Sequence, residues 1–329
     1  MNKTLLALLG MLPLASHAQD AGELRRQLKE KEAEVQRLKE RIARLEPGSS
    51  PQRFDPGAEP AADDELDPDS ERALERALVR ERGLLLSPRR VEIEPNFAYS
   101  YFDTQGGSLK RQAYGPGLSL RLGLPARFQF EAGIPYVWER RDSAGTKTRA
   151  SGTGDGYVAL SRQLLLEGRG RPGVIASLGY QFANGRNTIF GSGTPVALGS
   201  GFDTISAGLT FIKRADPLVF FGSYSFAHGF SEDRSGVRID PGQSHALRLG
   251  TALATSPGTS LRAAFSMRFF DKIRAGGTPV PGSGDPAGVL ELGGSATLNA
   301  SSAIDVLLGI GVTRNAPDFR IGIALPIRF

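Results

Sequence analysis

From Val91 to Phe329, apolar and polar residues alternate along the chain in runs of about eleven positions. A period of two places the two kinds of residue on opposite faces of a β-strand, and runs of this length are typical of strands that cross a membrane as part of a barrel. The pattern predicts twelve strands within residues 90–329. The expected strands lie near 91–101, 117–124, 128–139, 155–166, 173–184, 202–212, 218–228, 244–254, 259–270, 288–298, 303–313 and 319–329.

The connections between the expected strands fall into two classes. Those after even-numbered strands are short, whereas those after odd-numbered strands are mostly longer, such as 184–201, 229–242 and 271–287. Bacterial outer-membrane barrels have an even number of strands, short periplasmic turns and longer extracellular loops. The sequence therefore predicts an all-β transmembrane barrel of 12 antiparallel strands in outer-membrane lipid, with the preceding residues in the periplasm. A soluble β-sandwich is the alternative, but it does not require so regular an alternation.

The last expected strand carries a pattern associated with barrel assembly. All its apolar residues fall on one face, and that face ends in Phe329. This resembles the C-terminal signal of outer-membrane proteins, which the barrel-assembly machinery recognises. We therefore expect that machinery to be a partner of the chain, with Phe329 as the assembly signal.

Four segments precede the barrel. Residues 1–18 are expected to form a cleaved signal peptide, with a positive start, a short apolar stretch and small residues at the cleavage site. Residues 19–46 have the heptad spacing of a periplasmic α-helical coiled coil, although a single amphipathic helix lying on the barrel is an alternative. Residues 47–67 form an acidic flexible linker, and residues 68–86 an amphipathic plug helix that suits a polar lumen or its mouth. The expected coiled-coil seam is Leu24, Leu28, Lys31, Val35, Leu38, Ile42 and Leu45, and the expected plug-helix residues are Arg72, Leu74, Glu75, Arg76, Leu78 and Arg80.

Composition agrees with this organisation and excludes several functions. The 329 residues contain no cysteine, which rules out a disulfide framework, thiolate catalysis and cysteine metal clusters. The 40 basic residues are nearly matched by 35 acidic ones, so the net charge of +5 gives no reason to expect a nucleic-acid partner. A mean hydropathy of −0.21 without a long apolar run excludes a helical membrane protein.

Charged residues within the expected strands fall on the polar face. A charge on the lipid-facing side of a barrel costs about 2–4 kcal/mol near the midplane, so these residues are expected to point into the lumen. Their mixed sign argues against a simple anion or cation porin, and mutual pairing that only stabilises the barrel is the alternative to a solute path. The pore-lining candidates are Glu92, Glu94, Arg121, Glu131, Glu139, Arg248, Arg262, Arg268, Glu291, Asp305, Arg320 and Arg328.

The sequence offers little for catalysis. After loss of the signal peptide only His228 and His245 remain as histidines, on neighbouring strands near the expected outer rim, and nothing defines a nucleophile–base pair around them. Two histidines are also a weak basis for a metal site. The glycine-rich stretches 152–156 and 191–194 lack the strand-to-helix context of a phosphate loop and are expected to be turns. No enzyme activity, metal or cofactor is therefore expected.

The order of these segments resembles a known family. The stretch Arg72–Phe102, RALERALVRERGLLLSPRRVEIEPNFAYSYF, together with the segment order, resembles the outer-membrane channel of the Fap functional-amyloid secretion system. The stretch Gly123–Arg140, GLPARFQFEAGIPYVWER, is similar to the broader transporter family named for the meta-pathway of phenol degradation. The resemblance implies a homotrimer with periplasmic coiled coils and a helical plug, and secreted amyloid subunits as partners.

Three functions follow as hypotheses. The resemblance implies a channel that exports an unfolded polypeptide such as an amyloid subunit and is gated by the 68–86 helix. The alternative is passive uptake of small, including aromatic, solutes. A remote alternative is a barrel hydrolase that uses His228 or His245.

Overall fold

The computed structural model describes residues 84–103, 109–143, 145–185, 198–215, 218–234, 236–256 and 258–329. The predicted signal peptide, coiled coil and linker, and residues 68–83 of the predicted plug helix, lie outside these described residues. No helix among the described residues is long and apolar enough to cross a membrane.

Nearly all regular structure in the described part is β-strand. One short 3-10 turn, η1 (Pro125–Arg127), joins the second strand to the third. The strands are β1 (Val91–Asp103), β2 (Leu109–Leu124), β3 (Phe128–Ser143), β4 (Thr146–Thr153), β5 (Tyr157–Leu165), β6 (Gly173–Gln181), β7 (Thr204–Ala215), β8 (Leu218–Gly229), β9 (Glu232–Arg234), β10 (Val237–Asp240), β11 (Gln243–Ser256), β12 (Thr259–Phe270), β13 (Arg274–Ala275), β14 (Thr278–Pro279), β15 (Ala287–Thr297), β16 (Ala303–Gly311), β17 (Phe319–Ala324) and β18 (Ile327–Arg328).

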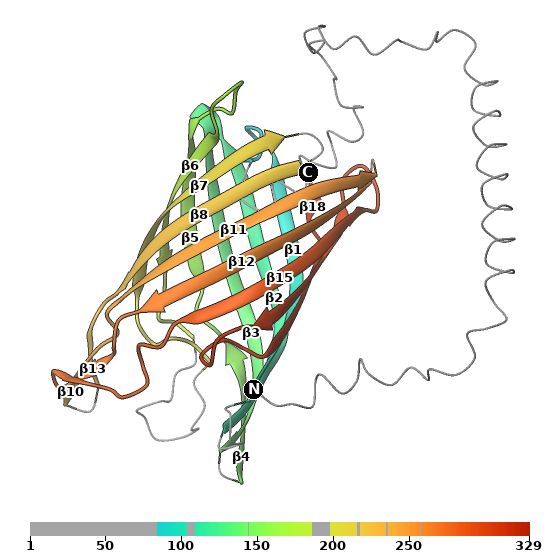
Figure 1. Cartoon of the computed structure of the whole chain (residues 1–329). Coiled ribbons are helices and arrows are strands. Elements are labelled where there is room, and N and C mark those ends of the chain that lie inside the picture. Colours follow the sequence, from blue (N-terminus) through green and yellow to red (C-terminus); the bar gives the residue numbers. More distant parts are fainter. Residues whose placement is uncertain are drawn as a thin grey trace, which may run out of the picture. The chain divides into compact units, whose positions relative to one another are not determined.

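These strands close into an antiparallel barrel with twelve strand positions (Figure 1). β4 and β5 pair in turn with the two halves of β3 and therefore occupy one position. β17 and β18, separated at Pro326, likewise form one position and both pair with β1, which joins the last strand to the first. The predicted number of strands and their antiparallel order are confirmed.

The two ends of the barrel differ as the connection lengths predict. Short turns lie at the end that holds the C-terminus, and longer segments extend from the opposite end (Figure 1). Two of the long connections pair with each other, because β9, β10, β13 and β14 form a separate four-stranded sheet. Two expectations were wrong. Residues 109–116 were placed before the second strand, but they belong to β2. Residues 140–143 and 146–153 were placed in a loop, but they extend β3 and form β4, because their pairing continues beyond the apolar run.

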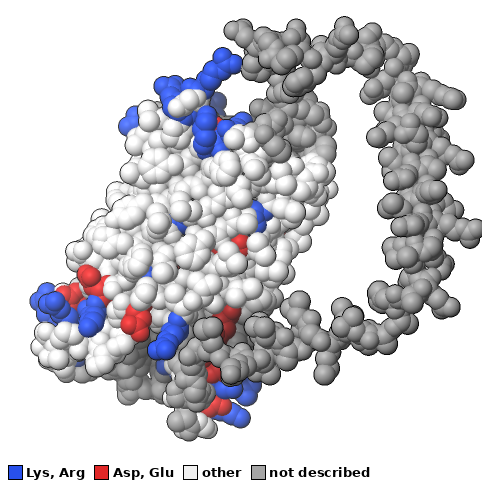
Figure 2. All heavy atoms as spheres, viewed as in Figure 1, with Lys and Arg blue, Asp and Glu red and all other residues white. Residues whose placement is uncertain are grey.

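The outer face of the barrel is apolar. Large side chains such as Leu118, Leu178, Leu249 and Leu290 are exposed on it. On the face seen in Figure 2, charged residues gather at the two ends and are sparse on the band between them. An exposed apolar band with charged borders is the surface that a lipid bilayer requires of a barrel. Arg162 interrupts the apolar series of β5 and lies near the end of that strand, next to a short turn. Its guanidinium carbon lies 4.9 Å from the ring centroid of Phe128.

Candidate functional site: the charged lumen

The structure places the predicted pore-lining residues on the inner face of the barrel. Neighbouring positions on each strand carry the outward apolar side chains, so alternation assigned the faces of these strands correctly. That the residues line a solute path stays a prediction. Buried among them are Glu92, Glu94, Arg121, Glu131, Glu139, Arg262, Glu291 and Asp305, while Arg248, Arg320 and Arg328 are half-buried and Arg268 is exposed to the lumen.

The first ion-pair network lies where the barrel closes. Glu92 of β1 stands opposite Arg121 of β2 on one side and Arg328 of β18 on the other. Its carboxylate oxygens lie 2.8 Å from Arg121 Nη1 and 2.6 Å from Arg328 Nε. The second amino group of Arg121 donates to Glu94 at 2.8 Å. Two carboxylates and two guanidinium groups therefore connect three adjacent strands across the seam, which we call the seam network.

A second network surrounds Glu291 on β15. Arg248 of β11 donates to Glu291 Oε2 at 2.8 Å, while Arg320 of β17 and Ser266 of β12 donate to Oε1. Arg320 must cross β16 to reach this carboxylate. It lies over Gly309, where a Cβ atom would be 2.5 Å from Arg320 Cγ, so the missing side chain makes room for the crossing.

The same arrangement recurs one strand away. Arg262 of β12 lies over Gly293 of β15, where a Cβ atom would be 2.5 Å from its Nε, and its Nη1 lies 3.7 Å from Asp305 of β16. In both cases a glycine in the inner wall lets an arginine reach a carboxylate one strand beyond its immediate neighbour. These glycines look like mere small lumen residues in the sequence, yet they determine which charges meet.

The remaining predicted carboxylates are held on β3. Tyr157 of β5 donates its hydroxyl to Glu131 at 2.8 Å. Glu139, nearer the outer end, lies 2.7 Å from Arg111 and 3.5 Å from Arg141. Every predicted lumen carboxylate is therefore bonded to a neighbouring side chain.

The inner face also carries an apolar cluster, which the alternation pattern does not predict. Its residues come from β6, β7, β8, β11 and β12, near the end with the short turns, and the run Leu218–Phe221 shows why alternation failed. When both faces of a strand are apolar, a period of two cannot tell which side chains point inward. The cluster consists of Ile175, Ile212, Val219, Phe221, Ala252 and Ala264.

The segment before β1 enters the lumen and contacts this cluster. Leu84 and Leu85 pack against the apolar residues of β6 to β12. Next to them, the Leu86 N–H donates to Gln129 Oε1 on β3 at 2.9 Å, and Leu86 itself is buried. Only β5 lies between β3 and the first strand of the cluster, so residues 84–86 lie along the inner wall from β3 to the cluster. These residues were predicted as the end of the plug helix, but they are not helical.

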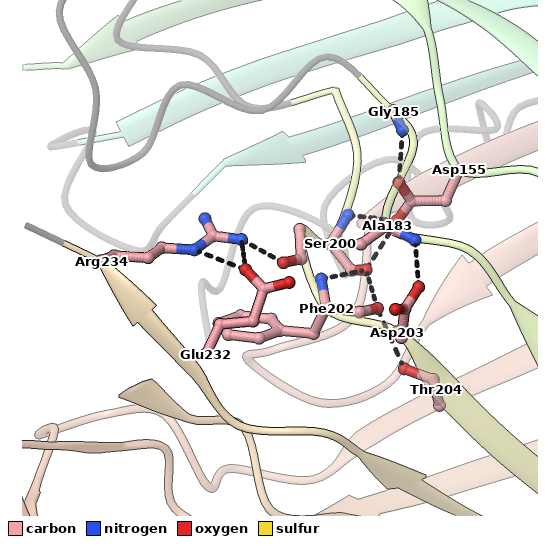
Figure 3. A network of polar contacts seen from close by, with 10 residues as sticks. Asp155, Ala183, Gly185, Ser200, Phe202, Asp203, Thr204, Glu232 and Arg234 are labelled. Atoms are coloured by element: carbon pink, nitrogen blue, oxygen red, sulfur yellow. Dashed lines mark hydrogen bonds and ion pairs between the residues drawn. The ribbon is translucent and has the colours of Figure 1, made fainter. Parts of the chain in front are cut away.

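The opposite end of the lumen holds a hub around Asp155 (Figure 3). Its carboxylate accepts hydrogen bonds from Gln181 Nε2 at 3.0 Å, Gly185 N at 2.9 Å, and both N and Oγ of Ser200 at 2.5 and 2.6 Å. A Cβ atom on Gly199 would lie 2.2 Å from Asp155 Oδ1, so only glycine permits this approach. Asp155 thus fixes both ends of the β6–β7 connection to the inner wall. In the sequence, Asp155 stands in the glycine-rich stretch 152–156, which was expected to be a turn without a functional role.

Beside this hub, Arg234 attaches β9 to the same connection. Its guanidinium lies 3.0 Å from Glu232, donates to the carbonyl of Gly201 and stands 4.8 Å from the ring centroid of Phe202 (Figure 3). Two outer connections are therefore held together by this arginine.

The two histidines do not form a site with the lumen residues. They lie in the outward series of β8 and β11, beside aromatic side chains. His245 Nδ1 lies 2.7 Å from the hydroxyl of Tyr224, and the His228 ring packs against Phe230. Among the described residues no carboxylate is bonded to either ring, and a catalytic base normally has such an orienting partner. The hydrolase hypothesis gains no support from this geometry.

Comparison with solved structures agrees with the fold. The crystal structure of the COG4313 outer membrane channel from Pseudomonas putida F1 matches with a TM-score of 0.65 and 16% identity, over 75% of this chain and 97% of that one. The chain has the fold of an outer-membrane barrel. The translocator domain of the autotransporter NalP from Neisseria meningitidis gives a TM-score of 0.45 at 11% identity, over 79% of this chain and 97% of that one. The CymD monoaromatic hydrocarbon channel gives 0.38 at 9% identity, over 73% and 88%. No protein-family model matches the sequence.

Proposed function

We propose that this protein is an outer-membrane channel whose lumen is restricted near its periplasmic end by the segment that precedes β1. The observation that carries the proposal is the position of Leu84, Leu85 and Leu86, which contact both the apolar cluster and β3. Apolar constrictions close pores by excluding water, and here both the wall and the inserted segment are apolar.

Small solutes are the cargo that the lumen favours. A cavity of about 390 Å³ opens beside Glu291, and its walls carry hydroxyl, guanidinium and apolar groups. A cavity of this size accommodates a small-molecule ligand. Passive uptake of small solutes is therefore our first candidate for the transported class.

Export of an unfolded polypeptide, such as a functional-amyloid subunit, is the second candidate. It is favoured by the non-helical backbone of residues 84–86, since a piece of chain that is not a helix lies against the inner wall of the barrel. The family resemblance and the predicted coiled coil at 19–46, with its implied trimer, belong to this proposal.

The restriction is tested by conductance in planar bilayers. Deleting residues 68–86, or making the double substitution Leu84→Ser and Leu85→Ser, should raise single-channel conductance, because either change removes the apolar contact of this segment with the inner wall. Ser87→Ala is the matched control. Ser87 lies in the same segment, but its side chain is exposed and forms no hydrogen bond with the described residues. Unchanged conductance in both variants would refute the role of the segment.

The two transported classes need separate assays. Swelling of liposomes in small neutral and charged solutes measures uptake directly. Loss of a secreted polypeptide from a strain that lacks the gene measures export. Liposome swelling together with normal secretion in the deletion strain supports uptake. Absence of swelling together with loss of the secreted polypeptide supports export.

A further inference from the structure

Positive charge exceeds negative charge in the cavity beside Glu291. Three guanidinium groups, from Arg248, Arg268 and Arg320, border it together with the single carboxylate of Glu291. That carboxylate already accepts hydrogen bonds from Arg248, Arg320 and Ser266. Its acceptor capacity is thus used, and two units of positive charge remain unbalanced by the residues that border the cavity.

Arg268 is the arginine of this cavity that is not bonded to Glu291. It is the one predicted lumen arginine with no carboxylate within ion-pair distance among the described residues, and it is exposed to the lumen. The strand register explains this isolation. Its cross-strand neighbours are Ala246 on β11 and Ala287 on β15, neither of which offers an acceptor side chain. Its guanidinium lies 5.9 Å from the ring centroid of Phe270, on the same face of β12.

The rest of the cavity wall has two kinds of surface. Ser223 and Ser225 of β8 supply hydroxyl groups, whereas Phe270, Val289 and Pro317 supply apolar contacts. Guanidinium groups bind carboxylates through charge-assisted hydrogen bonds, and apolar walls bury the body of a ligand. The cavity therefore offers a site for a negative group attached to a small apolar body.

We propose that this cavity binds small organic monocarboxylates, with Arg268 as the group that holds the carboxylate. This proposal rests on the proposed channel function and names the class of solute that the channel selects. Arg248 and Arg320 add positive potential but stay engaged with Glu291, so Arg268 contributes the free hydrogen-bond donors.

Binding is tested by isothermal titration of the full chain in detergent with benzoate. Benzyl alcohol has a similar shape without the charge and serves as the comparison ligand. Wild-type protein should bind benzoate, and Arg268→Gln should weaken that binding by about tenfold or more, as expected for the loss of a charge-assisted hydrogen bond. Arg268→Lys should retain part of the affinity. Arg162→Gln, which removes an outward arginine, is the matched control and should bind as the wild type does.

Conductance under a salt gradient gives the second measurement. Arg268→Gln should shift the reversal potential toward cation selectivity, whereas Arg162→Gln should not. The gel shift on heating, which reports a folded barrel, establishes that each variant has assembled. The site is refuted if benzoate does not bind the folded wild type, binds no better than benzyl alcohol, or binds the Arg268→Gln variant equally well. A folded protein that binds benzoate but conducts no ions would instead refute the channel function and leave the site standing.

Discussion

Removing one charge from the seam network should destabilise the whole barrel. Glu92 is 1% exposed and bonds to Arg121 and Arg328 on the strands at either side. Breaking a buried ion pair by removing one partner costs about 3–5 kcal/mol. The lower end applies to Glu92→Gln, because glutamine keeps one acceptor oxygen and the side chain of Arg328 is 31% exposed to lumen water. We therefore expect the free energy of unfolding to fall by about 3 kcal/mol.

A double-mutant cycle separates the ion pair from general damage. Arg121→Gln leaves Glu92 and Glu94 without their shared cation, so its loss should be at least as large. The combined variant should lose about 2 kcal/mol less than the sum of the two single losses, because each single change leaves an unpaired buried charge. Unfolding by urea in lipid vesicles, followed by the fluorescence of Trp138, measures all three. Losses that add to within about 0.5 kcal/mol would show that the two residues do not interact and would refute the reasoning.

Three further predictions concern other parts of the barrel. Gly309→Ala should destabilise the barrel by about 1–3 kcal/mol, because the new methyl group would overlap with Arg320. Gly322→Ala is the control and should be tolerated, because the nearest atom to its Cβ would lie at 3.7 Å. Equal urea midpoints for the two variants would contradict this. Trp138 lies on the outer face, stacked on Tyr114 with 5.7 Å between the ring centroids. Lipids brominated on their acyl chains should therefore quench its fluorescence more strongly than aqueous iodide does. Stronger quenching by iodide would place Trp138 outside the membrane. Asp155→Asn should speed hydrogen exchange at the amides of Gly185 and Ser200, which donate to that carboxylate. Substitution of the exposed Asp233 of β9, Asp233→Asn, should leave their exchange unchanged. Protection that survives in the Asp155→Asn variant would show that the hub does not hold this connection.

For the strand segments that carry lumen charges, the sequence predicted which face points inward but not which inward residues meet. The inward position of Glu92, Arg121 and Glu291 follows from a period of two, because a charge on the lipid side is costly. Their partners depend on register across strands that are distant in the chain. Arg320 reaches Glu291 only because Gly309 lies between them, and no local pattern contains that information.

Other features were missed for different physical reasons. Val219 and Phe221 lie in a run that is apolar on both faces, so alternation could not assign them to the lumen. Asp155 belongs to a glycine-rich stretch that resembles any turn, and its role depends on donors more than twenty-five residues away along the chain. The isolation of Arg268 became visible only when the lumen carboxylates had been assigned to other arginines.

The seam network also has a consequence for how the molecule is made. Glu92 and Arg328 are separated by 236 positions in the sequence, so their contact requires nearly the whole barrel to be in place. Until it forms, β1 and the β17–β18 strand are open edges that can pair with other chains. Contacts between such distant residues form late, and slow formation prolongs the exposure of those edges. The ion pair of Glu92 with Arg328 therefore stabilises only the closed barrel. A chain that stalls before closure keeps two open edges, and its Glu92 pairs with Arg121 alone.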